Sequence, residues 1–357
     1  MRMHRATVPR RLATTLSLRA VVATLLLSTT AVLAQTSPAP AIAEDQRVLP
    51  YVMPGQLVDI GHRRINLQCS GSGGPTVILM AGIFSWSLVW YKTQPSIAQA
   101  THVCGFDRAS YGFSDPAPRP QILSDVVDDL HAALAAASIP GPYVLVGHSL
   151  GGLEARLYTQ RWPKEVAGMV LVDTSPAEQE LLDEDQPDYD EANGPETRAA
   201  KLLKCALLAL KGPLDPSTPE FRSCTVDLPS DTPAAFRAIW PQFFTAPYFA
   251  AKVSLMSSLY VHRYDSVDHL RLGAMPLVVL SAGDTWHFDN PTPAQVRFER
   301  AYTKIWIARQ AALAHLSSRG VHRTIKGSSH DIELDKPQAI IDAVHEVLRE
   351  LRAETTS

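Results

Sequence analysis

One serine lies in a short glycine-rich segment whose pattern is typical of an activated nucleophile. Residues 143–152 read YVLVGHSLGG: an apolar run ends at Gly147, and Ser149 follows two residues later. A serine at a sharp strand-to-helix turn needs small neighbours, because larger side chains would collide with the strand and the helix. The turn also points the amide of Leu150 toward any negative charge that forms beside the serine. The pattern predicts that Ser149 is a nucleophile. A turn that only packs a helix onto a strand is the alternative.

A serine hydroxyl needs a base to accept its proton, and His330 is the best placed of the twelve histidines. It lies in IKGSSHDIELDKP (325–337), after the last expected strand and before the final expected helix. Loops at the carboxyl ends of parallel strands converge on one crevice, which would bring His330 to Ser149. His148 is adjacent to Ser149 in the chain, but its side chain is expected to point away from the turn.

The reaction also needs a second backbone donor for the oxyanion, besides Leu150. The segment AGIFSWS (81–87) follows an expected strand, and its glycine gives the backbone access to the site. We assign this donor to the amide of Ile83, with Phe84 as the neighbouring alternative. An ordinary strand-to-helix turn is the competing interpretation.

The elements that must position these residues alternate along the chain. Strand-like runs cover residues 63–69, 76–80, 102–106, 143–146, 168–172, 277–281 and 322–325. Helical patterns cover roughly residues 87–99, 122–137, 150–162, 293–317 and 337–352. Strands that are apolar along most of their length, alternating with helices, predict an α/β fold with a mostly parallel sheet covered on both faces.

The alternation stops between residues 176 and 270, which suggests an insertion. This region is helical, rich in proline and acidic, and includes EQELLDEDQPDYDE (178–191). The predicted organisation is therefore a signal peptide (1–34), a linker (35–46), a first part of the core (47–175), a helical insertion (176–270) and a second part of the core (271–357).

The N-terminus has the pattern of a secretory signal. Five arginines precede an apolar run (20–27) and a small-residue stretch that ends at Ala34, and the first acidic residue is Glu44. We expect cleavage after Ala34 and export to the periplasm or the medium, with no stable membrane insertion afterwards. The apolar run is short for a membrane span, so an uncleaved anchor is the weaker alternative.

Charge and cysteine content exclude several classes of partner. Without the five N-terminal arginines the chain has 28 basic and 36 acidic residues, a net charge of −8, and it has no basic stripe that would favour nucleic acid. The four cysteines lack the C-x-x-C spacing of metal sites. In an exported chain an even number favours disulfides. We expect neither a metal nor another cofactor.

Several segments together resemble the α/β-hydrolase superfamily, in its capped, single-chain serine esterase-like branch. They are GPTVILMAG, VCGFDRASYGFSDP, GPYVLVGHSLGG, PKEVAGMVLVDTSP, PLVVLSAGD and GSSHDIELDKPQAIIDAV. The resemblance covers nearly all of residues 63–351 except the insertion. It implies an eight-stranded sheet with only the second strand antiparallel, and it makes the insertion a helical cap over the crevice. Many relatives have a histidine-glycine pair at the oxyanion loop, where this chain has Ala81 and Gly82.

The resemblance also implies two disulfide pairs and two residues that support the loops beneath the site. In this fold the second and fourth strands are neighbours, and they carry Cys69 and Cys104, so the expected disulfides are Cys69–Cys104 and, within the cap, Cys205–Cys224. Asp107 occupies a family loop motif with Arg108, and both are expected to brace loops beneath the site.

Two aspartates compete to orient His330, and both satisfy the chain order Ser…Asp…His. Asp284 follows the strand at 277–281, where most of the superfamily places its acid, although Thr285 falls at the commonest spacing. Asp173 ends the strand at 168–172, a position used by a minority of relatives. Asp289 would serve only with a longer loop. We favour Asp284, with Asp173 as the alternate acid.

The expected reaction is hydrolysis of a carboxylic ester through an acyl-enzyme. Relatives that open epoxides or displace halide use an aspartate at the turn, and Ser149 argues against both. Cap aromatic residues favour an apolar ester of moderate size, although most are expected to pack the cap onto the core: Trp240, Phe243, Phe244, Tyr248, Phe249 and Tyr260. The alternatives are another triad hydrolase (aminopeptidase, lipase or cofactor-free perhydrolase) or a non-catalytic binding protein on the same fold.

Overall fold

The protein is described by a computed structural model. The structure describes residues 45–177, 195–226, 228, 230–261, 264–284 and 292–355. The expected signal peptide, nearly all of the linker, the acidic stretch 178–191 and Asp289 lie outside the described residues.

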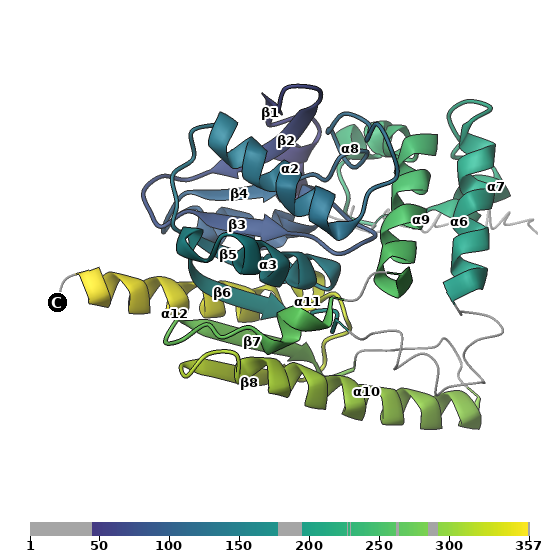
Figure 1. Ribbon diagram of the computed structural model, residues 1–357. Coiled ribbons are helices and arrows are strands. Elements are labelled where there is room, and N and C mark those ends of the chain that lie inside the picture. The colour runs from purple at the N-terminus through teal and green to yellow at the C-terminus, as the bar shows by residue number, and fades with distance from the viewer. Residues whose placement is uncertain are drawn as a thin grey trace, which may run out of the picture. The chain divides into compact units, whose positions relative to one another are not determined.

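An eight-stranded sheet forms the core, in the order β1-β2-β4-β3-β5-β6-β7-β8 (Figure 1). The strands are β1 Gln56–Asp59, β2 Arg64–Ser70, β3 Val77–Met80, β4 Val103–Phe106, β5 Tyr143–His148, β6 Val166–Val172, β7 Leu277–Ala282 and β8 Gly320–Ile325. Strand β2 is antiparallel to both of its neighbours, and all other pairs are parallel. The predicted fold class, including the single antiparallel strand, is confirmed.

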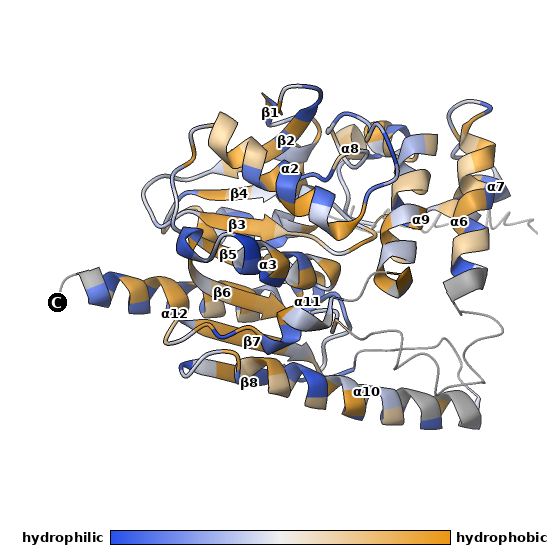
Figure 2. Ribbon diagram, viewed as in Figure 1, coloured by the Kyte–Doolittle hydropathy of each residue, from blue (hydrophilic) through white to orange (hydrophobic). Residues whose placement is uncertain are grey.

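The central strands are buried on both faces, and this explains their nearly continuous apolar sequence. Alternate residues of β3 enter different cores: Ile78 packs with helices α2 (Leu123–Ala136) and α3 (Leu150–Arg161), whereas Val77 packs with α12 (Pro337–Thr355). Helix α10 (Pro293–Ala314) packs against β7 and β8, and its last residues form a third cluster with β6 and β7. Figure 2 shows β3, β4 and β6 orange along their lengths, while the edge strand β8 carries hydrophilic positions.

Most predicted helices are observed within a few residues of their expected ends. The pattern at 87–99 instead forms a 3₁₀ helix, η2 (Ser87–Lys92), followed by the short helix α1 (Gln94–Ile97). Pro95 lies in the first turn of α1, where its missing N–H removes no helical hydrogen bond. Strand β1 was not predicted, because only Val58 of its four residues is buried.

Between β6 and β7 the described residues form helices, which we call the cap helices: α6 Pro195–Ala209, α7 Pro219–Cys224, α8 Ala234–Ile239 and α9 Ala246–Val261. They lie beyond the carboxyl ends of the strands (Figure 1). Two short 3₁₀ helices, η4 (Trp240–Phe243) and η5 (Asp265–His269), accompany them. The limits of the insertion, 176 and 270, stay a prediction.

Aromatic packing joins the cap helices to the core. Trp86, on the loop after β3, stacks on Trp240 at 5.6 Å between ring centroids and lies 4.9 Å from Phe243. The hydroxyl of Tyr248 donates to the carbonyl of Phe84, at 3.3 Å. Five of the cap aromatic residues named in the sequence analysis are buried: Trp240, Phe243, Phe244, Tyr248 and Phe249. Packing therefore accounts for most of that cluster.

Both predicted disulfides are present. Cys69 pairs with Cys104, and these residues face each other in the register of β2 and β4. Cys205 of α6 pairs with Cys224 of α7. Among the described residues, no helix is both long and apolar enough to cross a membrane.

Candidate active site

Ser149 lies at a strained turn between β5 and α3. Its φ of 51° and ψ of −120° place it in a region that residues other than glycine rarely adopt. Hydrogen bonds hold this geometry: the Ser149 amide donates to the Val172 carbonyl at 3.0 Å, and the Ser149 carbonyl accepts from the Ser175 amide at 3.0 Å. The backbone is thereby fixed at the carboxyl ends of β5 and β6.

Two glycines are required by close backbone approaches at this turn. A Cβ on Gly147 would lie 2.4 Å from the Gly151 carbonyl oxygen, and a Cβ on Gly151 would lie 2.2 Å from the carbonyl oxygen of Met80 in β3. Neither backbone can move away without separating α3 from the sheet. The steric reason predicted for the glycine-rich segment is therefore confirmed.

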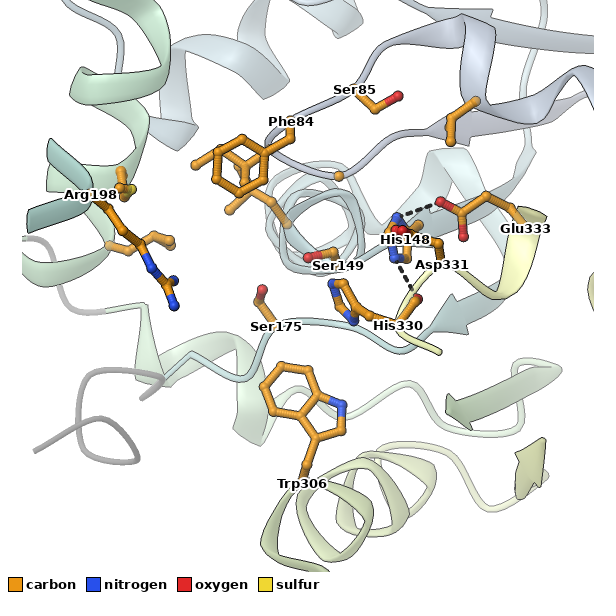
Figure 3. Close-up of a pocket in the computed structure, with 16 residues that line it drawn as sticks. Phe84, Ser85, His148, Ser149, Ser175, Arg198, Trp306, His330, Asp331 and Glu333 are labelled. Atoms are coloured by element: carbon orange, nitrogen blue, oxygen red, sulfur yellow. Dashed lines mark hydrogen bonds and ion pairs between the residues drawn. The ribbon is translucent and has the colours of Figure 1, made fainter. Parts of the chain in front are cut away.

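Ser149 and His330 line the same cavity, of about 190 Å³. Figure 3 shows the His330 ring beside Ser149, with Trp306 below it. The His330 side chain is 34% exposed, so the ring is open to the cavity. The structure thus brings the predicted nucleophile and the predicted base together.

Asp173 is the carboxylate that contacts His330. Its Oδ2 lies 2.6 Å from His330 Nδ1, and the side chain is fully buried. Its Oδ1 accepts from the Ala282 amide at 2.9 Å and from Trp306 Nε1 at 2.8 Å. This arrangement fixes the carboxylate and leaves the other histidine nitrogen, Nε2, for the cavity.

The preference for Asp284 is therefore wrong, and the alternate Asp173 takes its place. Asp284 is exposed, and among the described residues its carboxylate makes no ion pair with His330. Its amide instead donates to the Ser328 carbonyl, at 3.0 Å. The reason lies in the backbone: Asp173 has φ 40°, an uncommon conformation, at the end of the strand adjacent to the one that carries Ser149.

The two predicted oxyanion donors, Leu150 and Ile83, both line the cavity. Leu150 begins α3, where first-turn amides have no acceptor within the helix. The loop that carries Ile83 is held from beneath, because Arg108 donates to the Gly82 carbonyl at 3.0 Å and forms a buried ion pair with Glu154 at 2.7 Å. The bracing role expected for Arg108 is confirmed, and the oxyanion role of the two amides stays a prediction.

Asp107 supports the neighbouring loops. Its carboxylate accepts from the amides of Ser87 at 2.9 Å and Phe113 at 3.0 Å, and from the Asn66 side chain at 2.8 Å. Burial raises its pKa, and these donors oppose that change. Asp107 is thus a loop brace, as expected, because its oxygens are engaged by backbone.

Comparison with known proteins agrees with this geometry. Residues 75–204 match the model of the alpha/beta hydrolase fold family. The structure is similar to a thermophilic esterase from Thermogutta terrifontis (TM-score 0.53, 19% identity, 81% of this chain and 94% of that chain) and to a bacterial membrane phospholipase A (TM-score 0.58, 17% identity, 86% and 89%). The chain has the alpha/beta hydrolase fold.

Curated sequence relatives match only locally. An uncharacterized protein of Schizosaccharomyces pombe is 33% identical over 150 residues, which are 34% of this chain and 28% of that protein. The chain spans between 18% and 37% of the length of the first three curated relatives that it matches. The comparisons together show an alpha/beta hydrolase fold.

A second histidine–carboxylate pair lies beside the first. His148 Nε2 lies 3.0 Å from the backbone carbonyl of His330, and its Nδ1 lies 3.0 Å from Glu333 Oε1 (Figure 3). The second contact is an ion pair rather than a well-aligned hydrogen bond. Burial disfavours the imidazolium, but the Glu333 carboxylate outweighs it and raises the pKa of His148 to about 9. His148 was expected to point away from the turn, but it lines the cavity with Ser149. Its Nε2 contact holds the His330 loop.

Two groups of side chains in the described part of the chain are close enough to hold a metal ion. One contains Cys69 and Cys104, whose sulfurs form a disulfide and are not available as thiolates. The other joins His148 and Glu333 to the exposed Asp331. His148 and Glu333 already neutralise each other as an ion pair. This group therefore serves as an electrostatic support for the His330 loop.

Sequence reasoning missed Trp306 and Glu333. Trp306 lies in the middle of α10, where its indole N–H reaches Asp173 across 133 residues. Glu333 is fully buried in the short helix α11 (Ile332–Asp335). One feature of the sequence could have pointed to Glu333: it is an acidic residue on the short helix that directly follows His330. Nothing local in the sequence marked Trp306.

Proposed function

We propose that this protein is a serine hydrolase that cleaves carboxylic esters through an acyl-enzyme. The observation that carries the proposal is the combination of a strained Ser149 with a histidine in the same cavity, whose ring is fixed by the buried Asp173 at 2.6 Å. A merely structural serine needs neither the strained backbone nor the oriented imidazole.

In the proposed mechanism, Ser149 Oγ attacks the ester carbonyl and its proton passes to His330 Nε2. Asp173 keeps the ring in the tautomer with Nδ1 protonated and stabilises the imidazolium. The amides of Leu150 and Ile83 donate to the oxyanion. His330 then protonates the leaving alcohol, and a water activated by the same histidine releases the acid.

The walls of the cavity favour an apolar ester of moderate size. Val89, Met256 and Leu259 line it together with the Ile83 and Phe84 loop. Its volume of about 190 Å³ is small beside ordinary drug-sized sites, which supports a short acyl or alcohol group. The solved relatives named as an esterase and a phospholipase are consistent with ester chemistry.

Export is part of the proposal. The N-terminal pattern of arginines, apolar run and small residues supports it, and so do two disulfides, which persist in oxidising compartments. N-terminal sequencing of the secreted protein tests it, with a new terminus near residue 35 as the expected result.

Labelling with a fluorophosphonate tests the chemistry. We expect one adduct, located at Ser149 by peptide mass, and none in Ser149→Ala. Ser175→Ala is the matched control, because Ser175 also lines the cavity. An unlabelled wild-type chain, or labelling that persists in Ser149→Ala, would remove the serine hydrolase proposal. A panel of esters and amides of increasing acyl length then separates an esterase from a peptidase.

A further inference from the structure

A lysine in the cap helices is buried without a carboxylate partner in the described part of the chain. Lys252 of α9 is 5% exposed. Its Nζ donates to the Tyr248 hydroxyl at 2.9 Å and lies over the rings of Phe84 and Tyr248, 4.4 and 4.5 Å from their centroids. Burial and the nearby Lys201 lower the pKa of Lys252 to about 7.

Lys252 lines a second cavity, of about 350 Å³. Lys201 and Arg198 of α6 line it as well, and no described residue in its lining is acidic. The rest of the wall is largely apolar, with Trp240, Phe244 and the Cys205–Cys224 disulfide. The cavity therefore combines apolar walls with positive charge.

This cavity adjoins the one that contains Ser149. Phe84 and Arg198 line both of them. Figure 3 shows the Phe84 ring above Ser149, and it shows Arg198 reaching in from α6 toward the same space. Lys252 packs against the Phe84 ring, which lines both cavities. A molecule bound at Ser149 that extends past Phe84 enters the second cavity.

We propose that the second cavity binds a carboxylate at the far end of the ester, so that the preferred substrate is an ester carrying a free acid group. This inference rests on the proposed function. A buried ammonium is unfavourable without a counter-charge, and cation–π contacts offset only part of that cost. A carboxylate that enters the cavity forms a charge-assisted hydrogen bond with Lys252, away from bulk water. The apolar walls accommodate the methylene chain that links this carboxylate to the ester.

The test compares matched 4-nitrophenyl esters. Hydrogen succinate, glutarate and adipate esters carry a terminal carboxylate, and butyrate, pentanoate and hexanoate esters of the same lengths do not. We expect the wild type to prefer the acid at one chain length. Lys252→Met should lower kcat/KM for that acid ester about 10- to 100-fold, the usual size of a lost charged hydrogen bond, and leave the alkyl ester within about twofold. Lys211→Met, which replaces an exposed lysine in the turn after α6, is the matched control.

Three results would overturn the inference. They are no preference for acids at any length, equal losses on both ester classes in Lys252→Met, or the same loss in Lys211→Met. Lys252→Arg keeps the charge and should recover part of the acid preference, which a purely structural lysine would not explain.

Failure of the proposed function has a different signature. If neither ester class is hydrolysed, calorimetric titration of the wild-type chain with hexanoate still tests the cavity. Binding that is weakened in Lys252→Met supports the anion site, and equal binding or none in both chains rejects it.

Discussion

Two histidine–carboxylate pairs lie side by side next to Ser149. They differ in whether the histidine ring keeps a nitrogen that can contact the substrate. In His330–Asp173 the carboxylate is held by two further donors, and the ring is 34% open to the cavity. In His148–Glu333 both ring nitrogens are engaged, and the pair is buried to 5% and 0% exposure. A general base needs one nitrogen free for the substrate, and only the first pair provides it. The second pair holds the first in place.

Removing the ring of each pair should give the largest difference. His330→Ala should lower kcat on a 4-nitrophenyl ester by about 10⁴ to 10⁶-fold, because the base is lost. His148→Asn should lower kcat on the same ester only about tenfold, because one hydrogen bond to the His330 loop is weakened. Steady-state kinetics on variants with native circular dichroism measure both. Equal losses would show that the two histidines act as one unit.

The second pair should also make stability depend on pH. Glu333 raises the pKa of His148 from 6.5 to about 9, so this stabilisation is complete below pH 6.5 and is lost as the pH rises through 9. The wild-type free energy of unfolding should fall across this interval by up to about 3 kcal/mol more than that of Glu333→Gln. Urea unfolding at pH 6 and pH 9.5 measures the difference.

The matched control for that comparison is Asp128→Asn, which removes an exposed ion pair with Arg161. Exposed ion pairs contribute little to stability, so the free energy of unfolding of Asp128→Asn should depend on pH as that of the wild type does. If Glu333→Gln and the wild type lose stability in parallel, the assignment of a charged His148 fails.

A smaller effect is expected from the indole that supports Asp173. Trp306→Phe keeps most of the ring and removes the N–H donor at 2.8 Å. The loss of this hydrogen bond should lower kcat about tenfold and leave KM nearly unchanged, because the carboxylate is less well fixed and the cavity keeps its wall. Tyr302→Phe, on the same face of α10, is the control, and a similar loss there would point to general disruption of the helix.

The sequence predicted the sheet and the turn at Ser149 well because their determinants are local. Apolar runs define the buried strands, and the glycines around Ser149 are required by contacts within and next to the turn. The acid could not be chosen in this way. Its identity depends on the φ of 40° at Asp173 and on donors from β7 and α10, more than 100 residues away. The buried role of Glu333 depends on a contact with His148 in β5 across the site.

The identity of the acid is the most direct test of the account. Asp173→Asn and Asp284→Asn are compared by kcat on the same ester. We predict a loss on the order of 10⁴-fold for Asp173→Asn, because the amide no longer orients and stabilises the His330 ring, and near wild-type activity for the exposed Asp284→Asn. Full activity in Asp173→Asn together with collapse in Asp284→Asn would contradict the account.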